Sequence, residues 1–385
     1  MIDDIIKPYP GEDEILFAKR KAYFNRLLRC RFIGGENIVV GMLRRAIPLN
    51  FDEKKRIDEI WAPYLPAKLR DIIIDDRYYA CYKGIKNQED DLFKYIPDRF
   101  VRTFIDDYYT NPQDSRPFDD KNVYDLFFND INRPKALFRK IKNLYLDANF
   151  NEISLKDVIK IGKSQPEVIC KIAKYSMAGY GILIWNSERD DESKLMDFLQ
   201  SADFIICQEM IKQHNELSRL NPSSVNTLRI FTLLFQGQVH VLSSIVRMGR
   251  NDSRLDNASQ GGLVCGIKPN GQLKDVAWTL LGDRFDRHPN GVDFSSVTIP
   301  NYLECINLVK SLAIRMSTIS RLVSWDLAIN EDGHPVFVEC NMTWTGTESL
   351  QIPNGPLFGD LTDDVLKEVF ANSYTIKSII KSFQQ

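Results

Sequence analysis

The stretch 324–344, SWDLAINEDGHPVFVECNMTW, decides the fold of this 385-residue chain. Two apolar runs, WDLAIN and PVFVEC, flank the turn residues EDG, and this pattern predicts an antiparallel hairpin. Asp326 lies near the start of the first strand, while Glu339 and Asn341 lie near the end of the second. Antiparallel pairing brings the three together, and Glu339 and Asn341, two positions apart, project from one face of their strand.

Two carboxylates and an amide oxygen on one face form a set of hard oxygen ligands. Mg²⁺ prefers such ligands and leaves its other positions to water and substrate phosphates. Carboxylates beside the apolar run VFV at 336–338 would be costly to bury without a cation. The pattern therefore predicts a Mg²⁺ site at Asp326, Glu339 and Asn341. A solvent-facing strand with its polar residues outward is the alternative.

A second segment, VICKIAKYSMAGYGILIW at 168–185, predicts a phosphate-binding flap. One strand ends at Lys171, a loop carries Gly179 and Gly181, and the chain then returns to apolar residues. Backbone N–H groups of such a loop can surround phosphates, and Lys171 places a point charge beside them. A plain hairpin turn has the same pattern and stays the alternative.

A third segment, NTLRIFTLLFQGQVHVLSSIVRMGR at 226–250, predicts a hairpin with one arginine in each strand. A charged guanidinium within an apolar strand needs an anionic partner, and the planar fork of Arg229 or Arg247 suits phosphate or carboxylate. The following loop, DNASQGG, offers the amide of Asn257 and a close approach of glycine backbone. Arginines on the exposed face of a half-buried sheet are the alternative.

The chain as a whole predicts a mixed α+β fold in three parts. Residues 1–118 are mostly helical in pattern and end in the loop-like segment NPQDSRPF. Residues 119–215 carry the flap, and residues 216–385 carry the metal hairpin. A stripe of apolar residues predicts a helix within 299–320. Short apolar runs predict strands near 168–172, 204–210, 226–235, 239–248, 263–267, 323–330 and 336–340.

Composition excludes several classes of protein. Lys+Arg 50 against Asp+Glu 52 gives a net charge of -2, so the chain lacks the basic excess of a general nucleic-acid binder. The start of the chain is acidic, and no apolar run approaches the roughly 20 residues of a membrane helix. Seven scattered cysteines without a CxxC pair predict reduced thiols. We expect a cytoplasmic protein with no nucleic-acid partner and no membrane span.

In order and spacing these segments resemble the ATP-grasp superfamily, in particular the sugar-transfer-associated ATP-grasp family. The resemblance extends from YIPDRF at 95–100 through DDKNVYDLF and VNTLRI to LQIPNG at 350–355. It implies the ATP-grasp fold, in which two α+β subdomains clasp ATP between antiparallel sheets, here preceded by the largely helical N-terminal region. The flap departs from the family pattern, because KYSMAGYGI contains fewer glycines and small residues than usual.

The resemblance also implies roles for particular residues. Those matching nucleotide-binding positions are Lys121, Lys171, Gly179, Gly181, Gln208, Glu209, Met210, Ile211 and His214. Within this set the two lysines contact phosphates, the run from Gln208 to Ile211 forms the adenine hinge, and His214 competes with Glu216 for the ribose. Those matching substrate and catalytic positions are Arg229, Arg247 and Asn257, and those matching metal positions are Asp326, Glu339 and Asn341.

The implied activity is that of an ATP- and Mg²⁺-dependent carboxylate-amine ligase. A carboxylate attacks the γ-phosphate to give an acyl phosphate, and an amine then displaces phosphate to give an amide. The resemblance implies two Mg²⁺ ions, with Mn²⁺ as a substitute, and small-molecule substrates, such as an amino acid joined to a sugar or uronic acid in surface polysaccharide biosynthesis. A sugar or small-molecule kinase on the same scaffold and a non-catalytic nucleotide-binding module are the alternatives.

Overall fold

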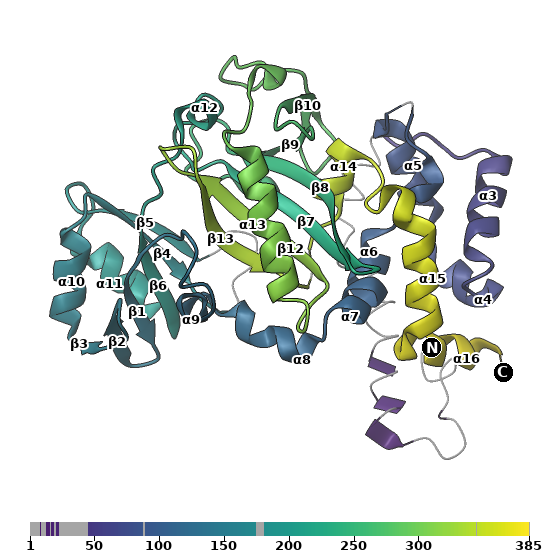
Figure 1. Cartoon of the computed structure of the whole chain (residues 1–385), viewed down its shortest axis with the longest axis horizontal. Coiled ribbons are helices and arrows are strands. Elements are labelled where there is room, and N and C mark those ends of the chain that lie inside the picture. Colours follow the sequence, from purple (N-terminus) through teal and green to yellow (C-terminus); the bar gives the residue numbers. More distant parts are fainter. Residues whose placement is uncertain are drawn as a thin grey trace.

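The chain folds into three blocks that lie in a row (Figure 1). The computed structural model describes residues 45–384 apart from 88, 175–180 and 344, together with 8, 13–15, 17–18 and 21–22. A small sheet with its helices lies at one end, a large sheet crossed by a long helix lies in the middle, and a helical block lies at the other end. Both sheets are antiparallel, as the predicted α+β class requires.

The small sheet has the strand order β3-β2-β1-β6-β4-β5. Its strands are β1 (Ala136–Ile141), β2 (Leu144–Asp147), β3 (Glu152–Ile153), β4 (Glu167–Ile172), β5 (Ile182–Asn186) and β6 (Phe204–Glu209). Helices α10 (Leu155–Lys163) and α11 (Glu192–Gln200) cover one face, where their Val158 and Leu195 share a core with Val168 and Cys170 of β4. Because side chains alternate along a strand, Lys171 projects from the opposite face.

The large sheet has the strand order β11-β10-β9-β8-β7-β12-β13. Its strands are β7 (Thr227–Phe235), β8 (Gln238–Met248), β9 (Leu263–Ile267), β10 (Leu273–Trp278), β11 (Arg284–Phe285), β12 (Leu322–Ile329) and β13 (Pro335–Asn341). Helix α13 (Tyr302–Arg315) covers one face, where Val309 and Leu312 share a core with Trp325 and Phe337. The helix predicted within 299–320 and the strands predicted from 226 onward therefore form.

The helical block contains elements from both halves of the chain. Its first set is α3 (Phe51–Trp61), α4 (Ala67–Ile73), α5 (Asp76–Ile85), η2 (Leu92–Lys94), α6 (Asp98–Phe100), η3 (Val101–Ile105) and α7 (Asp106–Tyr109). Its second set is α14 (Glu348–Asn354), η8 (Gly359–Leu361), α15 (Thr362–Asn372) and α16 (Tyr374–Gln384). Phe100 stacks on Phe370 with ring centroids 5.7 Å apart, and Phe231 and Ile245 of the large sheet belong to the same core. The block thus covers the sheet face opposite α13.

Short helical elements occupy the connections. They are α8 (Pro112–Ser115), η4 (Arg116–Asp119), η5 (Lys121–Val123), α9 (Tyr124–Phe127), α12 (Asn215–Ser218), η6 (Ala258–Gln260) and η7 (Phe294–Ser296). The division into 1–118, 119–215 and 216–385 stays a prediction, and the observed core joins residues of the last part to helices of the first.

Two connections hold the small sheet against the β12–β13 hairpin. In the first, Lys121 N donates to Ala173 O at 2.9 Å, and Phe337 N donates to Asn132 O at 2.9 Å. In the second, which follows β6, His214 N donates to Ile329 O at 3.0 Å. The end of β4 and the end of β6 therefore lie near the hairpin that carries the predicted metal residues.

The described cysteines are all buried free thiols, in agreement with the predicted reduced state. Cys30 lies outside the described residues. Within the described part of the chain, no helix combines the length and the apolar character needed to cross a membrane.

Candidate active site

The predicted metal residues meet on paired strands of the large sheet. Asp326 of β12 lies directly opposite Glu339 of β13, and Asn341 lies opposite Ser324. A bulge follows, so that Leu327 pairs with Phe337. Because the bulge adds one residue to β13, Phe337 enters the core under α13 while Glu339 faces the other side of the sheet. The structure brings the three predicted residues together, and their role as ligands stays a prediction.

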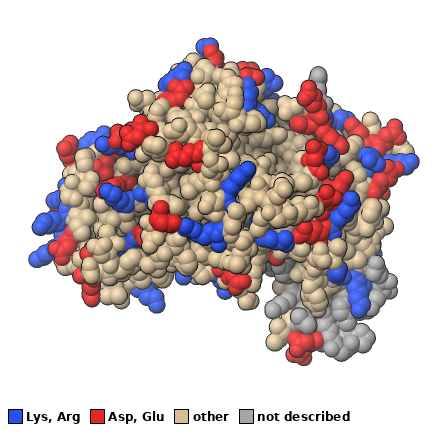
Figure 2. Space-filling view, in the orientation of Figure 1, with Lys and Arg blue, Asp and Glu red and all other residues tan. Residues whose placement is uncertain are grey.

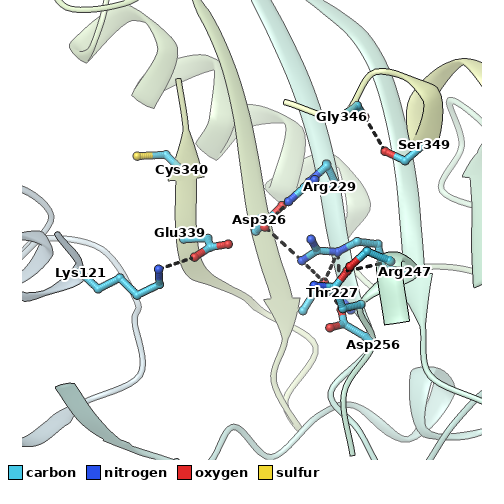
Figure 3. A network of polar contacts seen from close by, with 12 residues as sticks. Lys121, Thr227, Arg229, Arg247, Asp256, Asp326, Glu339, Cys340, Gly346 and Ser349 are labelled. Carbon is cyan, nitrogen blue, oxygen red and sulfur yellow. Dashed lines mark hydrogen bonds and ion pairs between the residues drawn. The ribbon is translucent and has the colours of Figure 1, made fainter. Parts of the chain in front are cut away.

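Two arginines of the neighbouring strands surround the carboxylate of Asp326 (Figure 3). Arg229 donates from Nε and Nη2 to the two carboxylate oxygens, both at 2.8 Å, and Arg247 Nη2 lies 3.0 Å from Oδ2. The Asp326 side chain is fully buried. Burial lowers and Asp326 raises the pKa of Arg229, and the net result is a pKa above the ordinary value. Arg229 is therefore a fixed, permanently charged group.

Asp256 and Thr227, which were not among the predicted site residues, complete this cluster. Arg247 donates from Nε and Nη2 to Thr227 Oγ1 at 2.9 and 2.6 Å. Asp256 Oδ2 accepts hydrogen bonds from the backbone N–H of Thr227, at 3.2 Å, and from its hydroxyl, and lies 3.6 Å from Arg247 Nε. The one available signal was that Asp256 adjoins Asn257 in the DNASQGG loop.

Two lysines from the small-sheet side contribute charge around Glu339. Lys121 Nζ lies 3.3 Å from Glu339 Oε2 (Figure 3). Burial raises the pKa of Glu339, but Lys121, Arg247, Lys171 and Arg229 lower it well below its usual range. Burial lowers the pKa of Lys171 to about 8, although Glu339 acts in the opposite direction. Glu339 is therefore a carboxylate at neutral pH, and Lys171 titrates near physiological pH.

The cluster has more cations than carboxylates. Its cations are Lys121, Lys171, Arg229 and Arg247, and its carboxylates are Asp256, Asp326 and Glu339. This local excess of positive charge favours a ligand with several negative charges, such as a polyphosphate. Over the face of the molecule seen in Figure 2, by contrast, acidic and basic side chains are interspersed.

The hairpin also fits a small, hard cation. Asn341 Nδ2 and Ser324 Oγ are buried, have no hydrogen-bond partner among the described residues, and lie opposite each other on the face of Asp326 and Glu339. Nδ2 is a hydrogen-bond donor and does not bind a cation, so the groups that suit one are Ser324 Oγ and the amide oxygen of Asn341, beside the two carboxylates. In the described part of the chain, no three His, Cys, Asp or Glu side chains are arranged so that they alone could hold a metal ion. A Mg²⁺ ion here would thus use the two carboxylates, the Asn341 amide oxygen, and phosphate or water oxygens.

Gly181 closes the predicted flap at the start of β5. Its φ is 73°, and its carbonyl accepts a hydrogen bond from Ile172 N at 2.8 Å. A Cβ at this position would lie 2.5 Å from Ile172 Cδ1, so both backbone conformation and packing require glycine. Gly179 and the rest of 175–180 lie outside the described residues.

The predicted adenine hinge lies at the end of β6. Gln208 is buried, and its Nε2 donates to Pro134 O at 3.2 Å. Glu209 ends the strand, and the half-buried Met210 and Ile211 continue toward the large sheet. The structure therefore places these residues in the connection between the two sheets, and their contact with adenine stays a prediction.

His214 and Asn257 each cap a short helix. His214 Nδ1 accepts from the backbone N–H of Glu216 at 3.1 Å, at the start of α12. Asn257 Oδ1 accepts from N and Oγ of Ser259 at 3.0 and 2.9 Å, at the start of η6. Capping satisfies N–H groups that a helix leaves free, so it accounts for Asn257, a preferred capping residue type, without a ligand. Their predicted contacts with ribose and substrate stay predictions.

Comparison with known proteins identifies the scaffold. A family profile described as sugar-transfer associated ATP-grasp matches residues 100–365. No curated protein matches the chain. The family match confirms the resemblance predicted from the sequence, and together with the two antiparallel sheets it confirms the predicted ATP-grasp fold.

Solved structures similar to the chain include three ligases. D-alanyl-alanine synthetase A from Vibrio cholerae is 11% identical, with a TM-score of 0.42 and coverage of 69% of this chain and 68% of that chain. The ATP-grasp ligase PsnB, complexed with a minimal precursor, is 12% identical, with a TM-score of 0.37 and coverage of 71% and 67%. L-amino acid ligase from Bacillus licheniformis is 14% identical, with a TM-score of 0.37 and coverage of 66% and 48%.

Proposed function

We propose that this chain, which belongs to the sugar-transfer-associated ATP-grasp family, is an ATP- and Mg²⁺-dependent ligase that joins a carboxylate to an amine. The observation that carries the proposal is the convergence of two arginines and two lysines, from both sheets, on Asp326 and Glu339. A nucleoside triphosphate between the sheets would meet this excess of positive charge with its phosphates.

The reaction we infer has two steps. An oxygen of the substrate carboxylate attacks the γ-phosphorus, the bond to the β-phosphate oxygen breaks, and ADP leaves with the bonding electrons. The amine nitrogen then attacks the acyl carbon of the acyl phosphate, and phosphate leaves. Phosphoryl transfer of this kind depends on positioning and on neutralising charge rather than on a protein nucleophile.

Different residues of the cluster would neutralise and position the phosphates. Lys121, on the connecting helix η5, and Lys171, on β4 of the small sheet, would neutralise phosphate oxygens. Arg229 is held by both oxygens of Asp326, so its guanidinium is in position before a substrate binds. Such preorganisation avoids rearrangement during the reaction. A Mg²⁺ ion held by Asp326, Glu339 and Asn341 would supply further charge neutralisation at the phosphates.

The substrate class is inferred from the family description. We infer that one substrate is a sugar-linked carboxylate such as a uronic acid, that the other is an amino acid or a simple amine, and that the product belongs to surface polysaccharide biosynthesis. The helical block, which packs against the sheet face carrying Arg229 and Arg247, would then shape the acceptor side of the site.

The test is a screen for ADP and free phosphate with MgATP, uronic acids and amino acids. A ligase releases both products in equal amounts only when carboxylate and amine are present together. A kinase releases ADP without free phosphate, and a binding module releases neither. Glu339→Gln and Asn341→Ala should lower turnover by ~100-fold or more, because charge stabilisation in the transition state is lost.

Two controls distinguish an effect on catalysis from an effect on the stability of the fold. Glu152→Gln lies on the exposed strand β3 of the small sheet and should leave ADP release unchanged. Melting temperatures of all variants should lie within a few degrees of the wild-type value, because the site residues bind ligands rather than fill the core. Undiminished ADP release in both site variants would contradict the assignment.

A further inference from the structure

A second polar cluster lies where the helical block meets the loop that follows β13. Asp98 Oδ1, at the start of α6, accepts from N and Oγ1 of Thr347 at 2.8 and 2.6 Å. Arg102 forms an ion pair with Asp98, and its Nη2 lies 3.8 Å from Glu348 Oε2. The Asp98 and Glu348 side chains are 6% and 5% exposed. Two buried carboxyl groups therefore share one guanidinium.

This cluster adjoins the phosphate-binding cluster. Helix α14 begins at Glu348 and packs on β8 and β9, where its Leu350 shares a core with Ile245. Ile245 lies directly opposite Arg229 and is two residues from Arg247 on the same face of β8. Figure 3 shows Gly346 beyond Arg229, on the side away from Lys121. Glu348 thus lies on the helical-block side of the candidate active site.

Gly346 leaves room in front of the two charged groups. Its φ is not positive, so its backbone conformation does not require glycine. A Cβ would have two neighbours within 4 Å among the described residues, Arg102 Nη2 at 3.7 Å and Glu348 Oε2 at 3.9 Å, both at ordinary contact distance. Among the described residues, neither a positive φ nor a steric clash accounts for the glycine. What it provides is space for a small polar group beside a carboxyl and a guanidinium.

Resting on the ligase function proposed above, we propose that Glu348 accepts the proton of the acceptor amine, while Arg102 and Asp98 hold its carboxyl group in position. The ammonium form of the acceptor gives one proton to Glu348 Oε2 and becomes a neutral amine. Its nitrogen attacks the acyl carbon, the C–O bond to phosphate breaks, and the electron pair leaves with phosphate. The second nitrogen proton goes to the leaving phosphate, and Glu348 releases its own proton to solvent after the product leaves.

The electrostatics of the cluster suit a base for an amine. Burial and Asp98 raise, and Arg102 lowers, the pKa of Glu348, with a result of about 8. A general base is most effective when its pKa lies near the working pH. Below about pH 8 the carboxyl is protonated and cannot accept, so amide formation should increase as pH rises through this value. The other groups that face the cluster are Asp106, Tyr78 and Tyr82.

Hydroxylamine separates amine activation from the rest of the reaction, because it is an uncharged nucleophile at neutral pH and needs no base. The protein is given MgATP, a mixture of D-glucuronate and D-galacturonate, and either hydroxylamine or a mixture of the common amino acids. Hydroxamate and amide are then measured by mass spectrometry across the pH range that brackets the Glu348 pKa. For Glu348→Gln the ratio of amide to hydroxamate should fall by ~100-fold, the usual scale of general-base catalysis, and the pH step near 8 should flatten.

Gly346→Ala provides a test that keeps the Glu348 carboxyl. The added methyl group fits without a clash but occupies the proposed amine position, so the KM for the amino acid should rise several-fold while hydroxamate formation persists. Glu152→Gln serves as the matched control and should change neither product. Equal loss of hydroxamate and amide in Glu348→Gln, or an unchanged ratio with the wild-type pH profile, would overturn the role of Glu348. Absence of hydroxamate with the wild-type chain would instead overturn the ligase function itself.

Discussion

The ion pair between Arg229 and Asp326 yields a stability prediction that a double-mutant cycle can measure. Arg229→Met removes two hydrogen bonds of 2.8 Å to a fully buried carboxylate. Hydrogen bonds to charged groups contribute about 1.5–3 kcal/mol each, and removing one partner of a buried ion pair costs about 3–5 kcal/mol. Arg247, at 3.0 Å, continues to neutralise Asp326, so we expect a loss of about 3 kcal/mol in the free energy of unfolding.

Asp326→Asn removes the negative charge between the two guanidinium groups and should lower the free energy of unfolding by a similar amount. The double variant should cost about 2 kcal/mol less than the sum of the single variants, because the second change no longer leaves a charge without its partner. The assay is urea unfolding of the nucleotide-free protein followed by tryptophan fluorescence, with the midpoint as the readout at constant m.

The surface pair of Arg287 and Asp293 is the matched control, because it has the same bidentate geometry, with donor–acceptor distances of 2.7 and 3.0 Å, but side chains 60% and 57% exposed. An exposed pair is screened by solvent and should show little coupling. If the cycle on Arg229 and Asp326 gave a coupling no larger than this control, burial would not be the source of its strength.

Three further perturbations test other parts of the site. Burial lowers the pKa of Lys171 to about 8, so the affinity of the wild-type protein for ATP, measured by calorimetry, should fall as pH rises through this value. Lys171→Arg should remove this pH dependence, because an arginine stays charged. An affinity that falls with pH as steeply in Lys171→Arg as in the wild type would contradict the role of Lys171. Asn122 is buried, and neither of its side-chain amide atoms has a hydrogen-bond partner among the described residues. Asn122→Leu should therefore raise the melting temperature of the nucleotide-free protein by a few degrees. A lower melting temperature would show that burying this amide does not cost stability. Gly181→Ala should destabilise the fold by about 1–2 kcal/mol more than Gly237→Ala, because both have positive φ but a Cβ at Gly237 would meet no described residue within 4 Å. Equal losses of unfolding free energy would rule out the contact with Ile172.

The β12–β13 hairpin could be predicted from the sequence because its signals are local. Alternating apolar residues and a turn rich in Asp and Gly specify two adjacent strands. Antiparallel geometry then places Asp326, near the start of the first strand, beside Glu339, near the end of the second. The bulge was not predictable. Alternation alone places Phe337 and Glu339 on the same face, whereas the extra residue in β13 separates them, and nothing in the run VFVEC marks where a bulge will form.

The sequence indicated that the two arginines need anionic partners, but not which residues these partners are. The apolar surroundings of Arg229 indicated an anionic partner, and the structure supplies Asp326, which lies 97 residues away in the sequence. That pairing depends on the register between β7 and β12, which the sequence of either strand alone does not specify. The contact of Asp256 with Thr227 depends in the same way on how a loop folds back over a strand.

The first strands of the small sheet were missed for a local reason. The hairpin of β1 and β2 turns at Lys142, which has a φ of 55°, where glycine or asparagine would have been the usual signal. Charged residues interrupt the strand pattern in ALFRKIKNLYLD, and Lys140 is satisfied by carbonyl groups of Leu199 and Ala202, at 2.6 and 2.8 Å, that only the folded sheet provides. Propensity is a weak guide where tertiary contacts of this kind decide the structure.

The shared core of the helical block has a consequence for protein synthesis. Asp98 and Thr347, which hydrogen-bond to each other, are 249 positions apart, and Phe100 stacks on Phe370. At elongation rates of roughly 5–20 residues per second, the ribosome needs roughly 12–50 s to reach Thr347 after it has made Asp98. Throughout this interval the early helices lack the surface against which they will be buried, and exposed apolar surface of this kind promotes aggregation. Residues of α14 and α15 therefore complete the core into which the early helices pack.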